Sequence, residues 1–286
     1  MKDISVEIGK KHVLHGFNLT AFSNEVLVLI GENGAGKSTV FETIAGLHHL
    51  HHGSVSGFGY DLVESLRYIT TNFLSLSAQE EVLIDYLTPE THIELFAMYM
   101  GLNNIDQLTQ DTLWEYDLQD CANIVSYRLS KIQRKRLALA LALLGDTKIV
   151  LLDEPTAGMD IASKRHIWQL IEQQKRKKCI IVATQDMNEA QRLGDRIGLM
   201  AGGQLVLCGS RNFIEEKFDH SMKLVFQMVR TVPAGVQQAK ENLEFVIRSM
   251  ISQEFTDKVT MSWNAKDQLE VKLPNGLTHK DLERAI

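Results

Sequence analysis

The residue types that could do chemistry lie first in a glycine-rich segment near the amino terminus. It consists of Gly31, Glu32, Asn33, Gly34, Ala35, Gly36, Lys37, Ser38 and Thr39. Glycines allow backbone N–H groups to curl around phosphate oxygens, and a helix that starts here points its positive end at them. Lys37 would add a charge beside the terminal phosphates, and Ser38 a hydroxyl ligand for Mg²⁺. The segment therefore matches the complete P-loop pattern.

A second group consists of two adjacent carboxylates, Asp153 and Glu154, which end the apolar run 149–152 in the layout called Walker B. Beside bound phosphates, Asp153 would hold Mg²⁺ through water, and Glu154 would orient and deprotonate the attacking water. Carboxylates at strand ends often cap a turn instead. The P-loop in the same chain favours the catalytic interpretation.

Buried strands and a following helix must position these groups. The apolar runs 25–30, 148–152 and 179–183 do not alternate with polar residues, which is typical of strands buried on both faces of a parallel sheet. The glycine-rich segment follows the first run and precedes a helical pattern, as a P-loop requires. The sequence thus predicts an α/β fold of the P-loop NTPase class.

Two further regions are predicted outside that sheet. Helical spacing from about 83 to 142, with a helix start at Thr88, indicates an inserted helical subdomain. A β-α-β-β order then appears, with strands at 222–229, 259–263 and 269–273, a helix at 236–250 and a further helix start at Thr278. A ferredoxin-like unit needs another helix and strand. We therefore expect one domain over residues 1–218 and a truncated, partial ferredoxin-like α+β lobe over residues 219–286.

Composition narrows the class of protein. With 286 residues, 44% of them hydrophobic, the chain can bury a core, so it is not disordered as a whole. The formal net charge of −6 argues against a nucleic-acid partner, because such proteins normally carry a basic surplus. No apolar run reaches the roughly 20 residues of a membrane-spanning helix, and residues 1–10 lack the layout of a signal peptide. We expect a cytosolic chain.

Cysteine and histidine spacing gives no strong signal for a further metal site. The three cysteines, Cys121, Cys179 and Cys208, lack paired short spacings, which argues against a disulfide framework or zinc. Four histidines gather at His48, His49, His51 and His52, and imidazoles at this density could bind a transition metal. Adjacent histidines in a surface loop usually stay solvated, and this is the favoured interpretation.

The residues around Asp153 also carry a family resemblance. The run 152–160 reads Leu-Asp-Glu-Pro-Thr-Ala-Gly-Met-Asp and resembles the Walker B motif and D-loop of ABC ATPases. Its alanine-glycine form is similar to subfamily A, the lipid-exporting branch. The segments 87–92, 166–168, 194–197 and 208–210 agree. The resemblance covers residues 4–215 and implies a RecA-like core with an antiparallel β subdomain, and the lobe after it is similar in element order to that subfamily's regulatory domain.

The resemblance implies ATP and Mg²⁺ as ligands and assigns further roles. Gln79 would be the Q-loop glutamine, which contacts Mg²⁺ and senses the membrane domain, and Asp160 the D-loop aspartate that communicates across a dimer. In such dimers each ATP lies between the P-loop of one domain and the signature loop of the other, here Ser130 and Gln133. The implied partners are a second, different ATP-binding domain arranged head to tail and transmembrane domains, at the cytosolic face of a membrane.

The sequence departs from the family pattern at three places. Lys131 and Ile132 replace two signature glycines, so a helix N-terminus should serve the partner's γ-phosphate poorly. Gln185 replaces the switch histidine; it can donate one hydrogen bond to the γ-phosphate but carries no proton or positive charge. Ile8 aligns with the aromatic residue that commonly stacks on adenine. Losing one donor to developing charge costs about 2.7 to 4 kcal/mol, so we expect slow hydrolysis in an asymmetric pair.

The sequence leaves three functions in competition. The leading hypothesis is an ATP-binding and ATP-hydrolysing domain that couples ATP to movement of a lipid-like substrate across a membrane. A nucleotide-binding regulator without significant hydrolysis is compatible with the changes at Lys131, Ile132 and Gln185. A soluble ABC ATPase acting on ribosomes or DNA usually carries two such domains or long coiled coils and tends to be basic, and this acidic chain has neither feature.

Overall fold

The structure, a computed structural model, describes residues 1–9, 11–61, 73–176, 178–217, 223–227, 260–263 and 268–272. The chain divides into two units, Met1–Arg211 and Asn212–Ile286, which are described separately below. The domain boundary predicted after residue 218 falls on residues outside the described ranges and stays a prediction.

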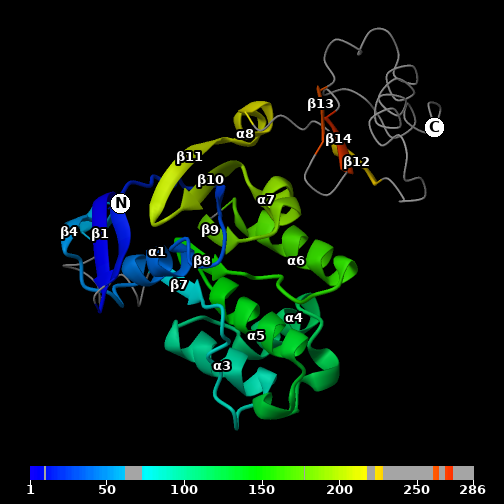
Figure 1. The fold of residues 1–286 in the computed structure, drawn as a ribbon. Coiled ribbons are helices and arrows are strands. Elements are labelled where there is room, and N and C mark those ends of the chain that lie inside the picture. Colours follow the sequence, from blue (N-terminus) through cyan, green and yellow to red (C-terminus); the bar gives the residue numbers. More distant parts are fainter. Residues whose placement is uncertain are drawn as a thin grey trace. The chain divides into compact units, whose positions relative to one another are not determined.

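A six-stranded sheet forms the centre of the first unit (Figure 1). Its strands are β3 (Val26–Ile30), β7 (Leu74–Ser77), β8 (Ile149–Asp153), β9 (Cys179–Thr184), β10 (Arg196–Ala201) and β11 (Gln204–Ser210). They lie in the order β11-β10-β3-β9-β8-β7, and all pairs are parallel except β10 with β11. Every residue of β3, β8 and β9 is buried, which confirms the three strands predicted from non-alternating apolar runs.

A smaller antiparallel sheet lies beside helix α1 (Lys37–Ile44). It contains β1 (Lys2–Ile8), β2 (Lys11–Phe17) and β4 (His52–Ser54) in the order β2-β1-β4, and a hairpin of β5 (Ser56–Gly57) and β6 (Tyr60–Asp61) follows. Its buried side chains share one hydrophobic cluster with strand β3 and with α1, through Ile4, Val6, Leu14, Phe17, Leu27, Leu29 and Phe41. This is the antiparallel β subdomain that the resemblance implied.

Three helices occupy the interval predicted to be helical: α3 (Pro89–Tyr99), α4 (Ile105–Glu115) and α5 (Lys131–Leu143), with 3₁₀ turns at Gln119–Cys121 and Ser126–Arg128 before α5. Thr88 caps α3 as predicted, since its hydroxyl oxygen accepts from the Thr91 amide at 3.2 Å. Lys178 is 1% exposed, and its ammonium donates to the carbonyls of Leu143 at 2.7 Å and Gly145 at 2.8 Å. A positive charge therefore fixes the C-terminal end of α5 at the start of β9.

Helices α6 (Ile161–Gln174) and α7 (Met187–Leu193) follow β8 and β9. A buried carboxylate joins them, because Glu189 on α7 is 1% exposed and accepts from the Trp168 indole N–H of α6 at 3.1 Å. The same carboxylate accepts from the Thr156 hydroxyl at 2.7 Å. The segment between β8 and α6 is thus held against α7.

Helix α8 (Arg211–Lys217) begins at the last residue of the first unit, and the second unit contains strands β12 (Lys223–Gln227), β13 (Thr260–Trp263) and β14 (Gln268–Lys272). The strand order is β12-β14-β13, and both pairs are antiparallel. The third strand in the sequence, β14, lies between the first two, β12 and β13, as in a split β-α-β unit. The predicted strands are therefore confirmed, whereas the helix predicted at 236–250 and the helix start at Thr278 lie outside the described residues. No helix in the described part is long and apolar enough to cross a membrane.

Candidate nucleotide-binding site

The P-loop connects β3 to α1 through two glycines in left-handed conformations. Gly34 and Gly36 have φ values of 81° and 102°, which favour glycine over any other residue. A Cβ on Gly36 would lie 3.1 Å from the Leu14 Cδ2 atom, so β2 packs directly on this turn. Gly36 is the N-cap of α1, and no side chain caps this helix. Its first backbone N–H groups are therefore suited to an anion.

Ten of the 15 predicted site residues line one cavity of about 210 Å³. Its lining consists of Asn33, Gly34, Gly36, Lys37, Ser38, Thr39, Gln79, Asp153, Glu154 and Gln185, with Lys11 and Val13. Gly31 and Ala35 line a neighbouring cavity instead. The start of α1, the end of β8 and the residue after β9 thus bring together groups that lie far apart in the sequence.

Lys37 occupies the phosphate end of this cavity. The residue is 7% exposed, and its ammonium donates to the carbonyl oxygens of Gly31 at 2.7 Å and Glu32 at 3.1 Å. Burial lowers the pKa of Lys37, and the carboxylates of Glu154 and Asp153 partly offset the shift. The P-loop's own carbonyls therefore hold the charge at a point where phosphate oxygens could replace them.

The two carboxylates at the end of β8 are also buried, with Asp153 4% and Glu154 9% exposed. Burial raises the pKa of both, while hydrogen bonds from the Ser38 hydroxyl to Asp153 and from the Gln185 amide to Glu154 act in the opposite direction. Glu154 has a φ of 49°, a left-handed value that is costly for a residue with a side chain. Its N–H donates to the Ala183 carbonyl at 2.8 Å, which fixes this turn against β9.

Gln185 joins Glu154 to the P-loop. Its Nε2 atom donates to Asn33 Oδ1 at 2.6 Å and to Glu154 Oε1 at 3.2 Å. A side-chain amide has two N–H donors, and both are engaged here by protein oxygens. A hydrogen bond from Gln185 to a γ-phosphate, as expected from the sequence, would therefore require one of these contacts to break.

Ile8, the residue expected to meet adenine, lies outside the cavity lining. Gln79, two residues after β7, lines the cavity, in keeping with the role that the family resemblance implied, but Ile8 is 43% exposed and does not line it. Ile8 pairs with Lys11 across the β1–β2 hairpin, and the lining side chains come from β2, as Lys11 and Val13. Sequence reasoning missed both residues, although their spacing of two along a strand is the pattern of one shared face.

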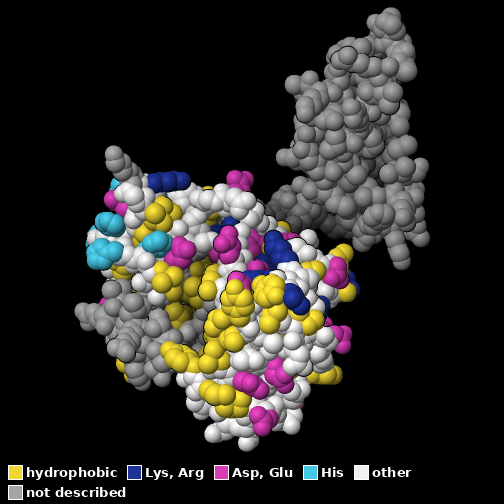
Figure 2. Space-filling view, turned by 90° about the horizontal axis from the view of Figure 1, so that it is seen from below, with side chains coloured by type: hydrophobic (Ala, Val, Ile, Leu, Met, Phe, Trp, Pro, Cys, Tyr) yellow, Lys and Arg dark blue, Asp and Glu magenta, His cyan; other side chains and the backbone are white. Residues whose placement is uncertain are grey.

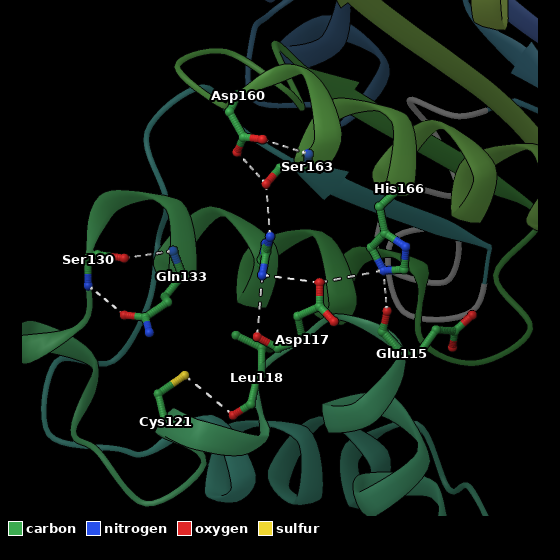
Figure 3. A network of polar contacts seen from close by, with 10 residues as sticks. Glu115, Asp117, Leu118, Cys121, Ser130, Gln133, Asp160, Ser163 and His166 are labelled. Carbon is green, nitrogen blue, oxygen red and sulfur yellow. Dashed lines mark hydrogen bonds and ion pairs between the residues drawn. The ribbon is translucent and has the colours of Figure 1, made fainter.

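Ser130 and Gln133 form a capping box at the start of α5 (Figure 3). The Ser130 hydroxyl oxygen accepts from the Gln133 amide at 3.2 Å, and Gln133 Oε1 accepts from the Ser130 amide at 2.9 Å. Lys131 and Ile132 are the first two residues of α5. Neither capping residue lines the P-loop cavity, so this chain's own site does not use them.

Asp160 caps α6 and belongs to a polar network that reaches helix α5 and the segment after α4 (Figure 3). Its carboxylate accepts from the Ser163 hydroxyl at 2.6 Å and the Ser163 amide at 3.2 Å, and these hydrogen bonds lower the pKa of Asp160. Arg136 of α5 donates to the Ser163 hydroxyl oxygen at 3.0 Å and forms an ion pair with Asp117 at 3.3 Å. The N-cap of α6, helix α5 and the segment after α4 are thus connected.

Three of the four clustered histidines face separate carboxylates, and the fourth, His49, has its ring centroid 6.1 Å from that of His51. His48 lies 2.8 Å from Glu42, His51 3.9 Å from Glu7, and His52 3.6 Å from Asp3. Within the described ranges, no group of three or more His, Cys, Asp or Glu side chains could hold a metal ion. The three cysteines are free thiols.

Comparisons with known proteins give the family. The family described as ABC transporter matches residues 14–157. The chain is 32% identical over 265 residues to the phospholipid-transporting ATPase ABCA3 of Homo sapiens, which covers 92% of this chain and 15% of that protein. It is 34% identical over 210 residues to ABC transporter A family member 2 of Arabidopsis thaliana, which covers 72% of this chain and 21% of that protein. The chain therefore corresponds to a small part of these relatives.

Solved structures agree with the predicted fold. The structure of an ATP binding subunit of an ABC transporter aligns with a TM-score of 0.70 and 27% identity, over 76% of this chain and 91% of that chain. The dimeric structure of a post-hydrolysis state of an ATP-binding cassette bound to ADP and Pi aligns with a TM-score of 0.68 and 25% identity, over 73% of this chain and 97% of that chain. This chain belongs to the ABC transporter family, as an ATP-binding domain that resembles subfamily A.

Proposed function

We propose that this chain binds ATP with Mg²⁺, hydrolyses it slowly and, within a transporter, couples ATP to movement of a lipid-like substrate across a membrane. The observation that carries the proposal is the convergence of Lys37, Ser38, Asp153 and Glu154 on one cavity at the uncapped start of α1. The phospholipid transport named for the human relative supports the substrate class.

The residues fit a phosphate chain with Mg²⁺. The start of α1 has no side-chain cap, and the Lys37 ammonium uses P-loop carbonyls where phosphate oxygens would bind. The hydrogen-bonded oxygens of Ser38 and Asp153 suit Mg²⁺, which usually takes one or two carboxylates together with waters and phosphates. Gln79 would add an amide oxygen at the same cavity. When bound, Mg²⁺ neutralises the charge that develops on the phosphates.

Glu154 is the residue that we assign as the general base. Burial raises its pKa, which increases the basicity available for taking a proton from water. Gln185 holds the carboxylate in place through its contact at 3.2 Å. Because glutamine stands where a histidine could supply positive charge, the developing charge on the phosphate loses one source of stabilisation. This supports slow hydrolysis.

A second, different ATP-binding domain would complete each composite site head to tail. The related cassette with ADP and Pi is dimeric. Here Ser130 lies exposed at the start of α5, and Arg136 connects this helix to the cap of α6 at Asp160, so both elements would approach a partner together. Lys131 and Ile132 add side chains where a nucleotide would meet α5. These substitutions support an asymmetric pair, in which this chain serves its partner's ATP poorly.

Transmembrane domains would contact an apolar patch that begins shortly after Gln79. Val82, Ile84, Tyr86 and Tyr127 are 89%, 50%, 82% and 50% exposed, and the last two rings lie 6.1 Å apart. Figure 2 shows hydrophobic side chains gathered on the face seen from below. Contiguous exposed apolar side chains mark contact surfaces, whereas single ones do not. The proposal therefore places the chain at the cytosolic face of a membrane, with the patch toward the membrane domain.

A nucleotide-binding regulator without significant hydrolysis is the second candidate. The observation that favours it is the engagement of both Gln185 donors, by Asn33 and by Glu154. A site held in this way could bind ATP without assisting the transfer of its γ-phosphate. Steady-state ATP hydrolysis, measured with and without the partner domains, separates the two functions: stimulation by the partners supports the transporter ATPase, and its absence supports the regulator.

Substitution of the P-loop lysine tests the binding site itself. Lys37→Ala should weaken Mg-ATP binding by at least about tenfold, because it removes the charge that faces the terminal phosphates. Titration calorimetry on the whole chain measures the change. Lys2→Ala is the control, since Lys2 is exposed on β1 and does not line the cavity. Equal affinities for the parent and Lys37→Ala would refute the assignment.

A further inference from the structure

The amide of Gln185 lies between two acceptors that differ in charge and in exposure. Its Nε2 atom donates to Asn33 Oδ1 at 2.6 Å, in a contact exposed to solvent, and to Glu154 Oε1 at 3.2 Å, in a partly buried contact. Because a carboxylate can only accept, the nitrogen of the Gln185 amide must point toward Glu154. Asn33 must then turn its oxygen toward the same nitrogen. The orientation of both amides therefore follows from Glu154.

The backbone beside Gln185 is held by neighbouring contacts. Gln185 directly follows β9, whose last residue, Thr184, accepts at its hydroxyl oxygen from the Asp186 amide at 3.0 Å. Asp186 is the N-cap of α7 and forms an ion pair with Lys164 of α6 at 2.6 Å. A side chain on an anchored backbone changes partners by rotation between its staggered conformations. Gln185 can thus exchange one acceptor without movement of the strand.

The contact with Asn33 is the one that a phosphate oxygen replaces more easily. Asn33 is exposed and its amide oxygen is neutral, so water can satisfy this oxygen when Gln185 leaves. Glu154 is 9% exposed, so loss of its donor would leave a buried carboxylate unsatisfied. Hydrogen bonds to charged acceptors are roughly twice as strong as those between neutral groups. A γ-phosphate oxygen therefore competes with Asn33 rather than with Glu154.

All three side chains line the nucleotide cavity, so this exchange takes place beside bound phosphates. We propose that Asn33 is a positioning residue that holds the Gln185 amide in the empty site, and that the γ-phosphate of ATP displaces it while the Glu154 contact persists. ADP has no γ-phosphate and leaves the Asn33 contact in place. Asn33 thus lowers the affinity for ATP relative to ADP. The inference rests on the proposed function, because it takes the P-loop as the phosphate site.

Titration calorimetry on the whole chain, with Mg²⁺ and either ADP or a non-hydrolysable ATP analogue, tests the proposal. Asn33→Ala removes the acceptor, and alanine suits this position because Asn33 has no positive φ. The ratio of ATP-analogue affinity to ADP affinity should rise about fivefold, which corresponds to one neutral hydrogen bond. Gln107→Ala should leave the ratio unchanged, since this amide of α4 donates to Asp111 at 2.7 Å and does not line the cavity.

Two further variants separate positioning from a change in the P-loop itself. Asn33→Leu keeps the shape of the side chain without its acceptor and should raise the ratio as Asn33→Ala does. In a Gln185→Ala background there is no amide to release, so Asn33→Ala should leave the ratio unchanged. This double-mutant cycle isolates the contact between the two side chains. Thermal unfolding verifies that each variant is folded.

Two outcomes would overturn the inference. A ratio that stays constant or falls in both Asn33 variants would show that Asn33 does not compete with the γ-phosphate. An equal rise with and without the Gln185 amide would show that Asn33 acts on the nucleotide by another route. Lys37→Ala separates these failures from that of the proposed function. If it abolishes binding of both nucleotides, the phosphate site stands whatever Asn33 does; if it changes neither, the phosphate assignment itself fails.

Discussion

The half of this domain that holds the P-loop and the half that is proposed to meet a partner domain are built differently. The P-loop half gathers Lys37, Asp153 and Glu154, each at most 9% exposed and each with a pKa shifted by burial. The half that would face a partner consists of helix caps, at Ser130 for α5 and Asp160 for α6. The caps satisfy backbone N–H groups within the chain and need no nucleotide to do so. Lys131 and Ile132, in place of the family's glycines, therefore leave α5 intact, and any cost would fall on binding across the proposed interface.

The largest effect should come from the P-loop half. Glu154→Gln removes the base but keeps its shape, so hydrolysis should fall by about a hundred- to ten-thousand-fold while ATP binding persists. Single-turnover hydrolysis and calorimetry measure the two properties separately. Glu172→Gln is the control, because this carboxylate of α6 pairs with Arg192 at 2.8 Å, away from the cavity lining. A Glu154→Gln variant that hydrolyses ATP at the parent rate would remove Glu154 from the mechanism.

Gln185→His should act in the same half and in the opposite direction. An imidazole can carry the positive charge that the glutamine lacks, so turnover at this chain's own nucleotide should rise by about tenfold or more. A rise confined to that site would show that residue 185 acts on the nucleotide bound by this chain's own P-loop. Single-turnover hydrolysis in the assembled pair, with one P-loop lysine disabled at a time, reads each site alone. A rise at the opposite site would contradict the head-to-tail arrangement.

The partner-facing half is tested by restoring its glycines. Lys131→Gly together with Ile132→Gly should raise turnover only at the partner's nucleotide, by a factor smaller than that of Gln185→His, because the start of α5 could then approach the phosphate more closely. The change should also lower the stability of this chain by about 1 kcal/mol for each glycine in the helix. Hydrolysis with one site disabled and chemical denaturation measure the two effects. Faster hydrolysis at the site that contains Lys37 would show that Lys131 and Ile132 do not face the partner's nucleotide.

The smallest expected effect comes from a buried histidine near the start of α3. His92 of α3 is 1% exposed, its Nε2 accepts from the Ile84 amide at 3.0 Å, and its Nδ1 lies 2.9 Å from the Thr88 carbonyl oxygen. Burial lowers the pKa of His92, and the charge of Arg134 also lowers it, against the effect of the Thr88 contact. The native state thus holds a neutral imidazole next to the apolar patch.

Stability should follow the protonation of this histidine. The unfolded chain regains the ordinary pKa of about 6.5 and then binds more protons than the native state, so the free energy of unfolding falls as the pH drops below that value. The slope from one proton is at most about 1.4 kcal/mol per pH unit. Denaturation between about pH 8 and about pH 5 should show a smaller decrease for His92→Gln than for the parent. Identical pH profiles would show that His92 contributes nothing.

The sequence predicted those features that are encoded by motifs of a few adjacent residues. The P-loop, the carboxylates that end β8 and the cap at Thr88 each follow from a few adjacent residues. The contact between Gln185 and Asn33 spans 152 positions, and no local pattern encodes it. The β1–β2 register, which pairs Ile8 with Lys11, is likewise set by tertiary packing. Alignment to a family position therefore indicated Ile8, while the side chains that face the cavity come from the next strand.

Helix α5 has a mechanical consequence, because both of its ends are fastened. The capping box at Ser130 holds the first turn, and the Lys178 ammonium holds the carbonyls at the last turn. Its 13 residues form a stiff rod of about 20 Å. Lys178 stands immediately before β9, and Gln185 immediately after it. Helix α5, the Lys178 ammonium and strand β9 thus form a continuous connection from Ser130 to the Gln185 amide that contacts Glu154.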